Sequence, residues 1–262
     1  MTTLIIAVGA SASAAFIAWR AGTLTGAGAV AAWSVAVPIL YGTGWEGGAV
    51  LAAFFVSSNL ISRIRPQQPP TVADPKGDRR DAWQVYANGA AAAVGGSLGI
   101  HDAALGMWVV TSSLAAAAAD TWATTSGGWS RVAPRLIWSG RRVVTGTSGG
   151  MTLLGTAGGA IGALIVAATG TLASGQPMLL AVGTLIGFLG MVGDSTLGAL
   201  LQGRFRCAAC DMASEWRVHR CGAPTTREGG ITWLNNDGVN LFATVLAAGS
   251  AWIVWYWVTP PA

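Results

Sequence analysis

The sequence has little charge, since only 10% of its 262 residues are Asp, Glu, Lys or Arg, against about 25% in an average soluble domain. A water-soluble globule of this size needs more charge to cover its surface, so the composition excludes a soluble enzyme. Disorder is also excluded, because disordered chains combine low hydrophobicity with high charge. Here 52% of the residues are apolar and the mean hydropathy is +0.52. The class that fits is a polytopic integral membrane protein.

Long apolar runs are abundant, and many reach the roughly 20 residues that a helix needs to cross a bilayer. These runs do not alternate apolar and polar residues, as the strands of a transmembrane β-barrel would. The sequence therefore predicts an all-α, polytopic transmembrane helical bundle of about eight spans, forming a single domain over residues 1–262. The expected spans are 2–18, 24–42, 46–62, 82–99, 103–125, 149–172, 177–201 and 233–257.

The basic residues indicate the orientation of this bundle. All 15 of them lie in four places, at Arg20, Arg63–Arg80, Arg131–Arg142 and Arg204–Arg227. These loops follow the first, third, fifth and seventh expected spans, so the positive-inside rule predicts that they are cytoplasmic and that both termini lie outside. We expect the membrane to be a prokaryotic inner membrane. The net charge of +4 follows from this topology, and nothing else supports a nucleic-acid partner.

Three aspartates lie inside expected spans, at Asp120, Asp194 and Asp237. Ionisable residues there are costly and are functional candidates by default, and the orientation places all three in the cytoplasmic half of the bundle. Carboxylate and amide oxygens suit hard cations, Mg²⁺ above all where phosphates complete the shell. The neighbouring polar candidates are Asn88, Ser195, Gln202, Asn236 and Asn240. A structural alternative stays open for Asp237 and for Asp81, which could simply cap helix N-termini.

Cationic and glycine-rich loops flank these carboxylates. Lys76, Arg79 and Arg80 precede the span at 82–99, and Lys76 is the one lysine of the chain. Two further arginines precede a loop whose successive backbone N–H groups, backed by a helix N-terminus, can bind an anion. The binding candidates in that loop are Thr147, Ser148, Gly149 and Gly150. Together these features indicate a polyphosphate with its metal at the membrane surface.

All three cysteines fall in one cytoplasmic loop, at 203–231. Cys207, Cys210, His219 and Cys221 offer the Cys₃His set of a structural zinc site, and four protein ligands leave no open position for catalysis. A disulfide is disfavoured because the loop faces the reducing cytoplasm. The alternative is a cysteine-rich loop without metal.

Five motifs together resemble one integral-membrane family, which contains transmembrane protein 19 and the plant phytyl-phosphate kinase of the vitamin E pathway. They occur in the order typical of that family and cover most of the chain after about residue 20. The motifs are Lys76–Gly89, Ala119–Thr124, Gly146–Thr152, Gly193–Gln202 and Trp233–Asn240.

The resemblance implies transfer of a phosphoryl group from a nucleoside triphosphate, with CTP favoured, to a prenyl monophosphate such as phytyl or geranylgeranyl phosphate. It also suggests kinship with dolichol kinase and the CDP-lipid synthases, in which a stretch like Gly193-Asp194 is associated with the metal-bound nucleotide. Thr125 departs from the pattern, because an acidic residue is expected there.

Combining the residues with this resemblance, we expect Asp120, Asp194 and Asp237 to hold Mg²⁺ on the nucleotide phosphates. Lys76, Arg79 and Arg80 would neutralise charge on the transferred group or on the acceptor. The expected partners are a lipid phosphate, a nucleotide and membrane lipids. Two alternatives remain, a cytidylyltransferase that makes a CDP-lipid and a cation-coupled transporter, although transporters place their sites near the midplane between inverted repeats.

Overall fold

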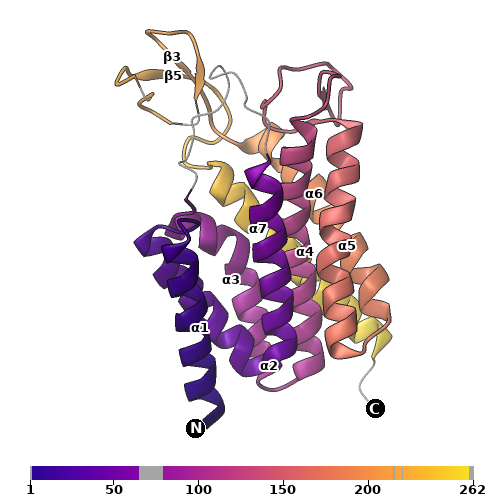
Figure 1. Cartoon of the computed structure of the whole chain (residues 1–262). Helices are drawn as coiled ribbons and strands as arrows, with labels where there is room; N and C mark the ends of the chain where they lie inside the picture. Colours follow the sequence, from indigo (N-terminus) through magenta and orange to yellow (C-terminus); the bar gives the residue numbers. More distant parts are fainter. Residues whose placement is uncertain (1, 65–78, 215, 220, 260–262) are drawn as a thin grey trace.

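The computed structural model describes residues 2–64, 79–214, 216–219 and 221–259. These residues are mostly helical and form a bundle with two small sheets in its loops (Figure 1). The helices are α1 Thr2–Arg20, α2 Gly26–Arg63, α3 Ala82–Gly99, α4 Ala103–Gly127, α5 Leu153–Ser174, α6 Met178–Leu201 and α7 Asn236–Val258.

Helix α2 joins two of the expected spans into one element that folds back on itself. Gly44 is its single non-helical residue, with φ 66° and ψ −159°, a left-handed φ that glycine adopts without strain. The first arm of α2 runs alongside α3. At its start the backbone N–H of Thr25 donates to the Arg80 carbonyl, just before α3, and at its end a Cβ on Gly42 would touch the backbone of Gly96, near the end of α3. At the far end of α2 the Ile64 carbonyl accepts from the indole of Trp129, at the end of α4. The two arms of α2 therefore run in opposite directions.

Six helices are long and apolar enough to cross a membrane: α1, α2, α4, α5, α6 and α7. The expectation of eight spans counted each arm of α2 and also α3 as separate crossings. That count stays a prediction. The helix bounds agree with the expected spans except at two N-termini, where α5 begins at Leu153 and α7 at Asn236.

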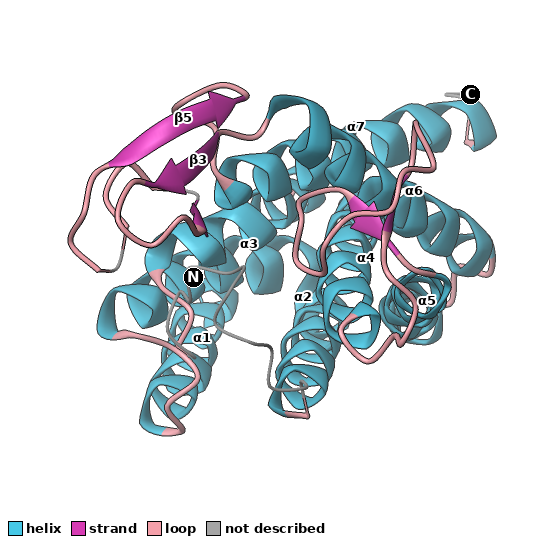
Figure 2. Cartoon of the chain, turned by 90° about the horizontal axis from the view of Figure 1, so that it is seen from above, coloured by secondary structure: helices cyan, strands magenta, loops and turns pink. Residues whose placement is uncertain are grey.

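Helix α4 forms the core of the bundle. Every residue from Leu105 to Ala119 is buried, and α4 packs against α2, α3, α5, α6 and α7 (Figure 2). Small residues make this close packing possible, because a Cβ on Gly187 or Gly190 of α6 would lie 2.6 Å from an alanine Cβ of α4. Such close backbone approach is typical of membrane helices, which gain little from hydrophobic burial against lipid.

The interhelical loops contain strands that the sequence did not indicate. β1 Arg135–Leu136 pairs with β2 Gly150–Met151, and β3 Arg204–Cys207 is the centre of a sheet with β4 Ala213–Ser214 and β5 Thr225–Gly229. The sheets lie at the end of the bundle where α4 ends and α7 begins, which we call the loop end. The start of α1 and the end of α7 lie at the opposite end (Figure 1).

Candidate functional site

Asp120 on α4 and Asp194 on α6 lie at the same level of two parallel helices. Gly183 packs against Thr111 and Gly190 packs against Ala116. Residue numbers therefore increase toward the loop end in both helices. Each aspartate lies one helical turn beyond the Ala116–Gly190 contact, because four residues make about one turn. Their carboxyl groups are close enough for their charges to interact.

The Asp194 side chain is enclosed and incompletely paired. It is 8% exposed, and its Oδ2 atom has no hydrogen-bond partner among the described residues. Asp120 is half-buried. An unpaired buried carboxylate oxygen is expensive, and a second carboxylate beside it adds repulsion. A cation between the two groups would remove both costs.

The predicted glycine-rich loop packs directly on the last turns of α6. The Ser148 hydroxyl donates to Gln202 Oε1 at 2.8 Å. Gly149 has φ +75°, and a Cβ built on it would lie 2.1 Å from the Ala199 Cβ and 2.5 Å from the Ser195 carbonyl oxygen. The structure therefore brings four of the predicted binding residues together on α6, in the turns that follow Asp194: Ser148, Gly149, Ser195 and Gln202. Thr147 and Gly150 flank this contact, and Gly150 begins β2.

The loop before α3 contributes one inward-facing cation. The Arg80 guanidinium lies 5.7 Å from the centre of the Phe54 ring on the second arm of α2, and desolvation lowers the pKa of Arg80 to about 10, so it stays charged at neutral pH. Arg79 is exposed and its Nε donates to the Gly22 carbonyl at 3.3 Å. Lys76 lies outside the described residues.

Asp81 acts as the N-cap of α3, in a reciprocal capping box with Gln84. This is the structural alternative that the sequence left open. The Asn88 amide donates to the Gln84 carbonyl at 2.9 Å, so its nitrogen serves the helix and its oxygen stays available to a ligand.

The polar residues at the start of α7 lie at different distances from the aspartate pair along the helix axis. Asn235, rather than Asp237, is the N-cap, and its side chain accepts from Gly238. Helices α6 and α7 run antiparallel, and the Ala247 Cβ lies 3.7 Å from a Cβ built on Gly190. Asp194, one turn after Gly190, is therefore level with the α7 position one turn before Ala247. Asp237 lies about 9 Å closer to the loop end by helical rise, and the structure does not group it with the aspartate pair.

Asn240 lies between these two levels. It is 8% exposed and its Oδ1 has no partner among the described residues. Asn236 is exposed in the first turn of α7, farther from the pair. The motif Ala119–Thr124 contains one further polar candidate that the sequence did not indicate: the indole N–H of Trp122, two residues after Asp120, is buried and unpaired in the described part of the chain.

The four predicted metal ligands of the 203–231 loop converge. One ligand atom from each of Cys207, Cys210, His219 and Cys221 lies within 4.8 Å of all the others. Cys207 Sγ is 3.5 Å from Cys221 Sγ, and His219 Nδ1 is 3.1 Å from the same sulfur. Tetrahedral zinc with metal–ligand bonds of about 2.0–2.3 Å separates its ligands by roughly 3.3–3.8 Å. The cluster could hold a metal ion of that kind.

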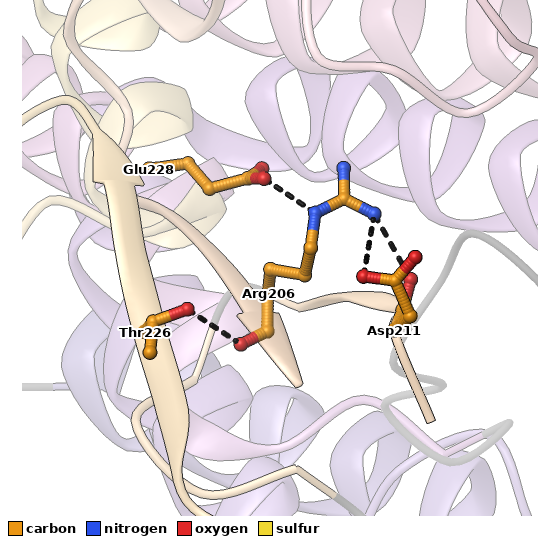
Figure 3. Close-up of polar contacts among 4 residues, drawn as sticks. All are labelled: Arg206, Asp211, Thr226 and Glu228. Atoms are coloured by element: carbon orange, nitrogen blue, oxygen red, sulfur yellow. Dashed lines mark hydrogen bonds and ion pairs between the residues drawn. The ribbon is translucent and has the colours of Figure 1, made fainter. Parts of the chain in front are cut away.

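The surroundings of this cluster favour metal binding. Backbone N–H groups of Cys210 and Ala209 donate to the sulfur of Cys207, and they lower the pKa of its thiol to about 7. On the adjoining sheet Arg206 pairs with Glu228 and Asp211, and its carbonyl accepts from Thr226 (Figure 3). The ion pairs link β3 to β5 and to the turn after Cys210. These contacts define a small sheet around the cluster.

The fold and this site define a helical integral membrane protein with acidic residues inside the bundle and a Cys/His-bearing sheet at one end. The chain belongs to the integral membrane protein family DUF92, whose sequence profile matches residues 9–248. This match confirms the membrane family that the five motifs predict.

Two relatives illustrate the breadth of this family. An uncharacterized membrane protein, MJ0933, of Methanocaldococcus jannaschii is 30% identical over 79% of this chain and 76% of its own length. Protein PGR of Arabidopsis thaliana is 26% identical over 94% of this chain and 93% of its own length. No solved structure matches the chain significantly.

Proposed function

We propose that the protein is a Mg²⁺-dependent membrane kinase that transfers the γ-phosphoryl group of a nucleoside triphosphate, CTP by preference, to a prenyl monophosphate such as phytyl or geranylgeranyl phosphate. The observation that carries this proposal is the pair formed by the half-buried Asp120 and the buried Asp194 near a glycine-rich loop. A paired carboxylate site next to the backbone N–H groups of Ser148 and Gly149 suits a metal-bound polyphosphate.

The donor set fits magnesium. Asp120 and Asp194 offer carboxylate oxygens, and the unpaired Oδ2 of Asp194 is the atom that most needs a cation. Asp237 and Asn236 stand nearer the loop end and are proposed to contact the nucleotide, with Asn240 and Asn88 between. Bound there, Mg²⁺ would neutralise charge on the phosphate oxygens.

The remaining groups position the substrates. In the loop Thr147–Gly150 the N–H groups of Thr147 and Gly150 already donate to the carbonyls of Val144 and Thr147, so those of Ser148 and Gly149 are proposed to bind phosphate oxygens. Arg80 supplies a positive charge whose attraction for phosphate is stronger in its partly desolvated surroundings. Lys76 and Arg79, which precede α3 together with Arg80, are proposed to assist. An oxygen of the prenyl monophosphate attacks the γ-phosphorus, the bond from that phosphorus to the β,γ-bridging oxygen breaks, and the nucleoside diphosphate leaves. The phosphomonoester is a nucleophile at neutral pH, so the reaction needs no strong general base.

Two features complete the proposal. The prenyl tail would lie between helices within the bilayer, which fits the cytoplasmic placement proposed for the loop end. The Cys207–Cys221 cluster would hold zinc as a structural ion that stabilises the sheet β3–β5, because all four positions are filled by protein ligands.

The test is an assay of the purified protein with prenyl monophosphates, Mg²⁺ and CTP, ATP or UTP, in which products are identified by mass spectrometry. We expect prenyl diphosphate and nucleoside diphosphate in equal amounts. Release of pyrophosphate and a CDP-lipid would instead identify a cytidylyltransferase. No product with any of the three nucleotides would refute the proposal.

Two carboxylate variants test the site itself. Asp120→Asn and Asp194→Asn should each lower turnover by at least about 100-fold, because each removes a charged ligand while keeping the side-chain shape. Glu46→Gln is the matched control, since Glu46 is exposed and lies beside Gly44 at the opposite end of the bundle. Normal turnover in Asp194→Asn would remove this residue from the site.

A further inference from the structure

A pocket of about 460 Å³ opens at the loop end, between the Cys/His-bearing sheet and the start of α7. It is lined by Trp216, Arg217 and Val218 on one side and by Thr232, Trp233 and Asn235 on the other. Two indoles, one guanidinium and small polar groups thus surround one hollow. Of these six residues only Asn235 already has a role, as the N-cap of α7.

The aromatic walls of this pocket suit a flat ring. The Trp233 side chain is 71% exposed, so its indole offers an open face, and Trp216 forms the wall on the other side of the pocket. Stacking of a nucleic-acid base on an aromatic side chain contributes about 1–3 kcal/mol and tolerates any base. Arg217 adds a cation beside the ring, which suits the ribose and phosphates of a nucleotide.

The pocket walls are held in place by backbone contacts. The Trp216 backbone N–H donates to Ser214 Oγ at 3.0 Å and its carbonyl accepts from Thr225 Oγ1 at 2.7 Å. His219, three residues later, belongs to the Cys/His cluster. On the other wall the Leu234 carbonyl accepts from Gly203 at 2.8 Å, which ties the segment before α7 to the end of α6.

The distance from this pocket to the aspartate pair matches an extended nucleotide. Asn235 lies about eight residues before the α7 position that is level with Asp194, which corresponds to about 12 Å of helix. Asp237 and the unpaired Asn240 Oδ1 lie along that path. The ribose and three phosphates of an extended nucleoside triphosphate can bridge this interval.

We infer that the pocket between Trp216 and Trp233 holds the base of the nucleotide donor, while the triphosphate runs along the start of α7 to Asp120 and Asp194. The inference rests on the proposed kinase function and names the base subsite of that same site. It also gives the Cys/His-bearing sheet a purpose, because the sheet forms one wall of the subsite.

Direct binding tests this inference without relying on turnover. Equilibrium dialysis of the purified protein would compare CTP and ATP with inorganic triphosphate, all with Mg²⁺. Trp233→Ala should weaken nucleotide binding about tenfold or more, as loss of one base stack implies, and leave binding of inorganic triphosphate unchanged. Trp83→Ala is the matched control, because Trp83 is 74% exposed in the first turn of α3 and does not line the pocket.

The remaining outcomes separate the subsite from the kinase proposal. If Trp233→Ala weakened the binding of nucleotide and inorganic triphosphate equally, or weakened neither, the base subsite would be refuted. Normal turnover in that variant would leave the kinase proposal unaffected. Weaker use of prenyl phosphate by Trp233→Ala and Trp83→Ala alike would assign both indoles to membrane anchoring and refute the inference. Failure of the unaltered protein to bind any nucleotide would refute both proposals.

Discussion

The contact of Gly149 with α6 allows a sharp test of the candidate site. Replacement by alanine has two separable consequences at this position. The backbone has φ +75°, and an L-residue in the left-handed region costs about 1–2 kcal/mol. In addition, the new Cβ would lie 2.1 Å from the Ala199 Cβ and 2.5 Å from the Ser195 carbonyl oxygen.

The second effect dominates because the atoms that it meets cannot turn away. Carbon atoms pack best at about 3.5–4.0 Å, so the loop must lift from α6 by about 1.4 Å before the two Cβ atoms reach ordinary contact. A displacement of about 1 Å in a positioning group can lower a catalysed rate on the order of 100-fold. We therefore expect Gly149→Ala to lower phosphoryl transfer by about that factor, with a thermal midpoint only a few degrees lower.

Gly140 provides the control for backbone strain. It has φ +62° in the same interhelical segment, but a Cβ built there meets nothing within 4 Å. Gly140→Ala should thus show only the part of the stability loss that backbone strain causes, about 1–2 kcal/mol, and retain near-normal turnover. The assay is the initial rate of prenyl diphosphate formation beside a thermal unfolding curve. If the two variants had equal rates, the loop would play no part in positioning the phosphates.

Three further predictions concern the zinc cluster, the membrane topology and the helix packing. The purified protein should contain one zinc ion, and Cys207→Ser should lose it. In this variant protease should cleave the β3–β5 sheet while the helical circular dichroism signal is unchanged. A zinc-free protein whose sheet resists protease would contradict this prediction. After chelation, a membrane-impermeant maleimide should label the three cysteines in everted vesicles only, and labelling of right-side-out vesicles would reverse the proposed orientation. Gly42→Ala should destabilise the protein by about 1–3 kcal/mol or more, because its Cβ would meet the Gly96 carbonyl; Gly9→Ala, which meets nothing within 4 Å, is the control, and an equal response would refute the packing argument.

The sequence predicts the helices well because their signals are local. Apolar length and flanking polar residues placed α3 within 82–99 and α4 within 103–125, and the structure differs by at most two residues. The reversal at Gly44 was also visible as a short break between two apolar runs. What the sequence did not reveal is that a single residue completes the turn, since this depends on a left-handed φ that many glycines could adopt.

The strands escaped prediction because they are short and lie in polar loops. The sequence of β3 does carry a signal, since Arg alternates with Phe and Cys along Arg204–Cys207, but four residues are too few to separate a strand from a loop. The paired strands depend on contacts with Thr225–Gly229, about twenty residues away. The spacing of the cysteines and the histidine was enough to predict the metal ligands. The sheet around them could not be predicted, because its strands pair through contacts that only the three-dimensional structure reveals.

The candidate site shows the same division between local and long-range information. Intramembrane position singled out Asp120 and Asp194 without any knowledge of their neighbours. Their common level depends on which glycines of α6 meet which alanines of α4, and no local pattern states that pairing. The packing of Gly149 on α6 and the separation of Asp237 from the pair are long-range in the same way.

The close packing of α4 on α6 connects the stability of the bundle to its proposed chemistry. Gly190 allows α6 to approach Ala116, and that approach forces the next turns, which carry Asp120 and Asp194, to lie side by side. A bundle selected for stability alone would avoid two facing carboxylates in its interior, because their repulsion and desolvation oppose folding. A cation at this level converts the same arrangement into a favourable one. The rigid helix contact thus supplies preorganised ligands, and it predicts that Mg²⁺ raises the thermal midpoint of the unaltered protein but not of Asp194→Asn.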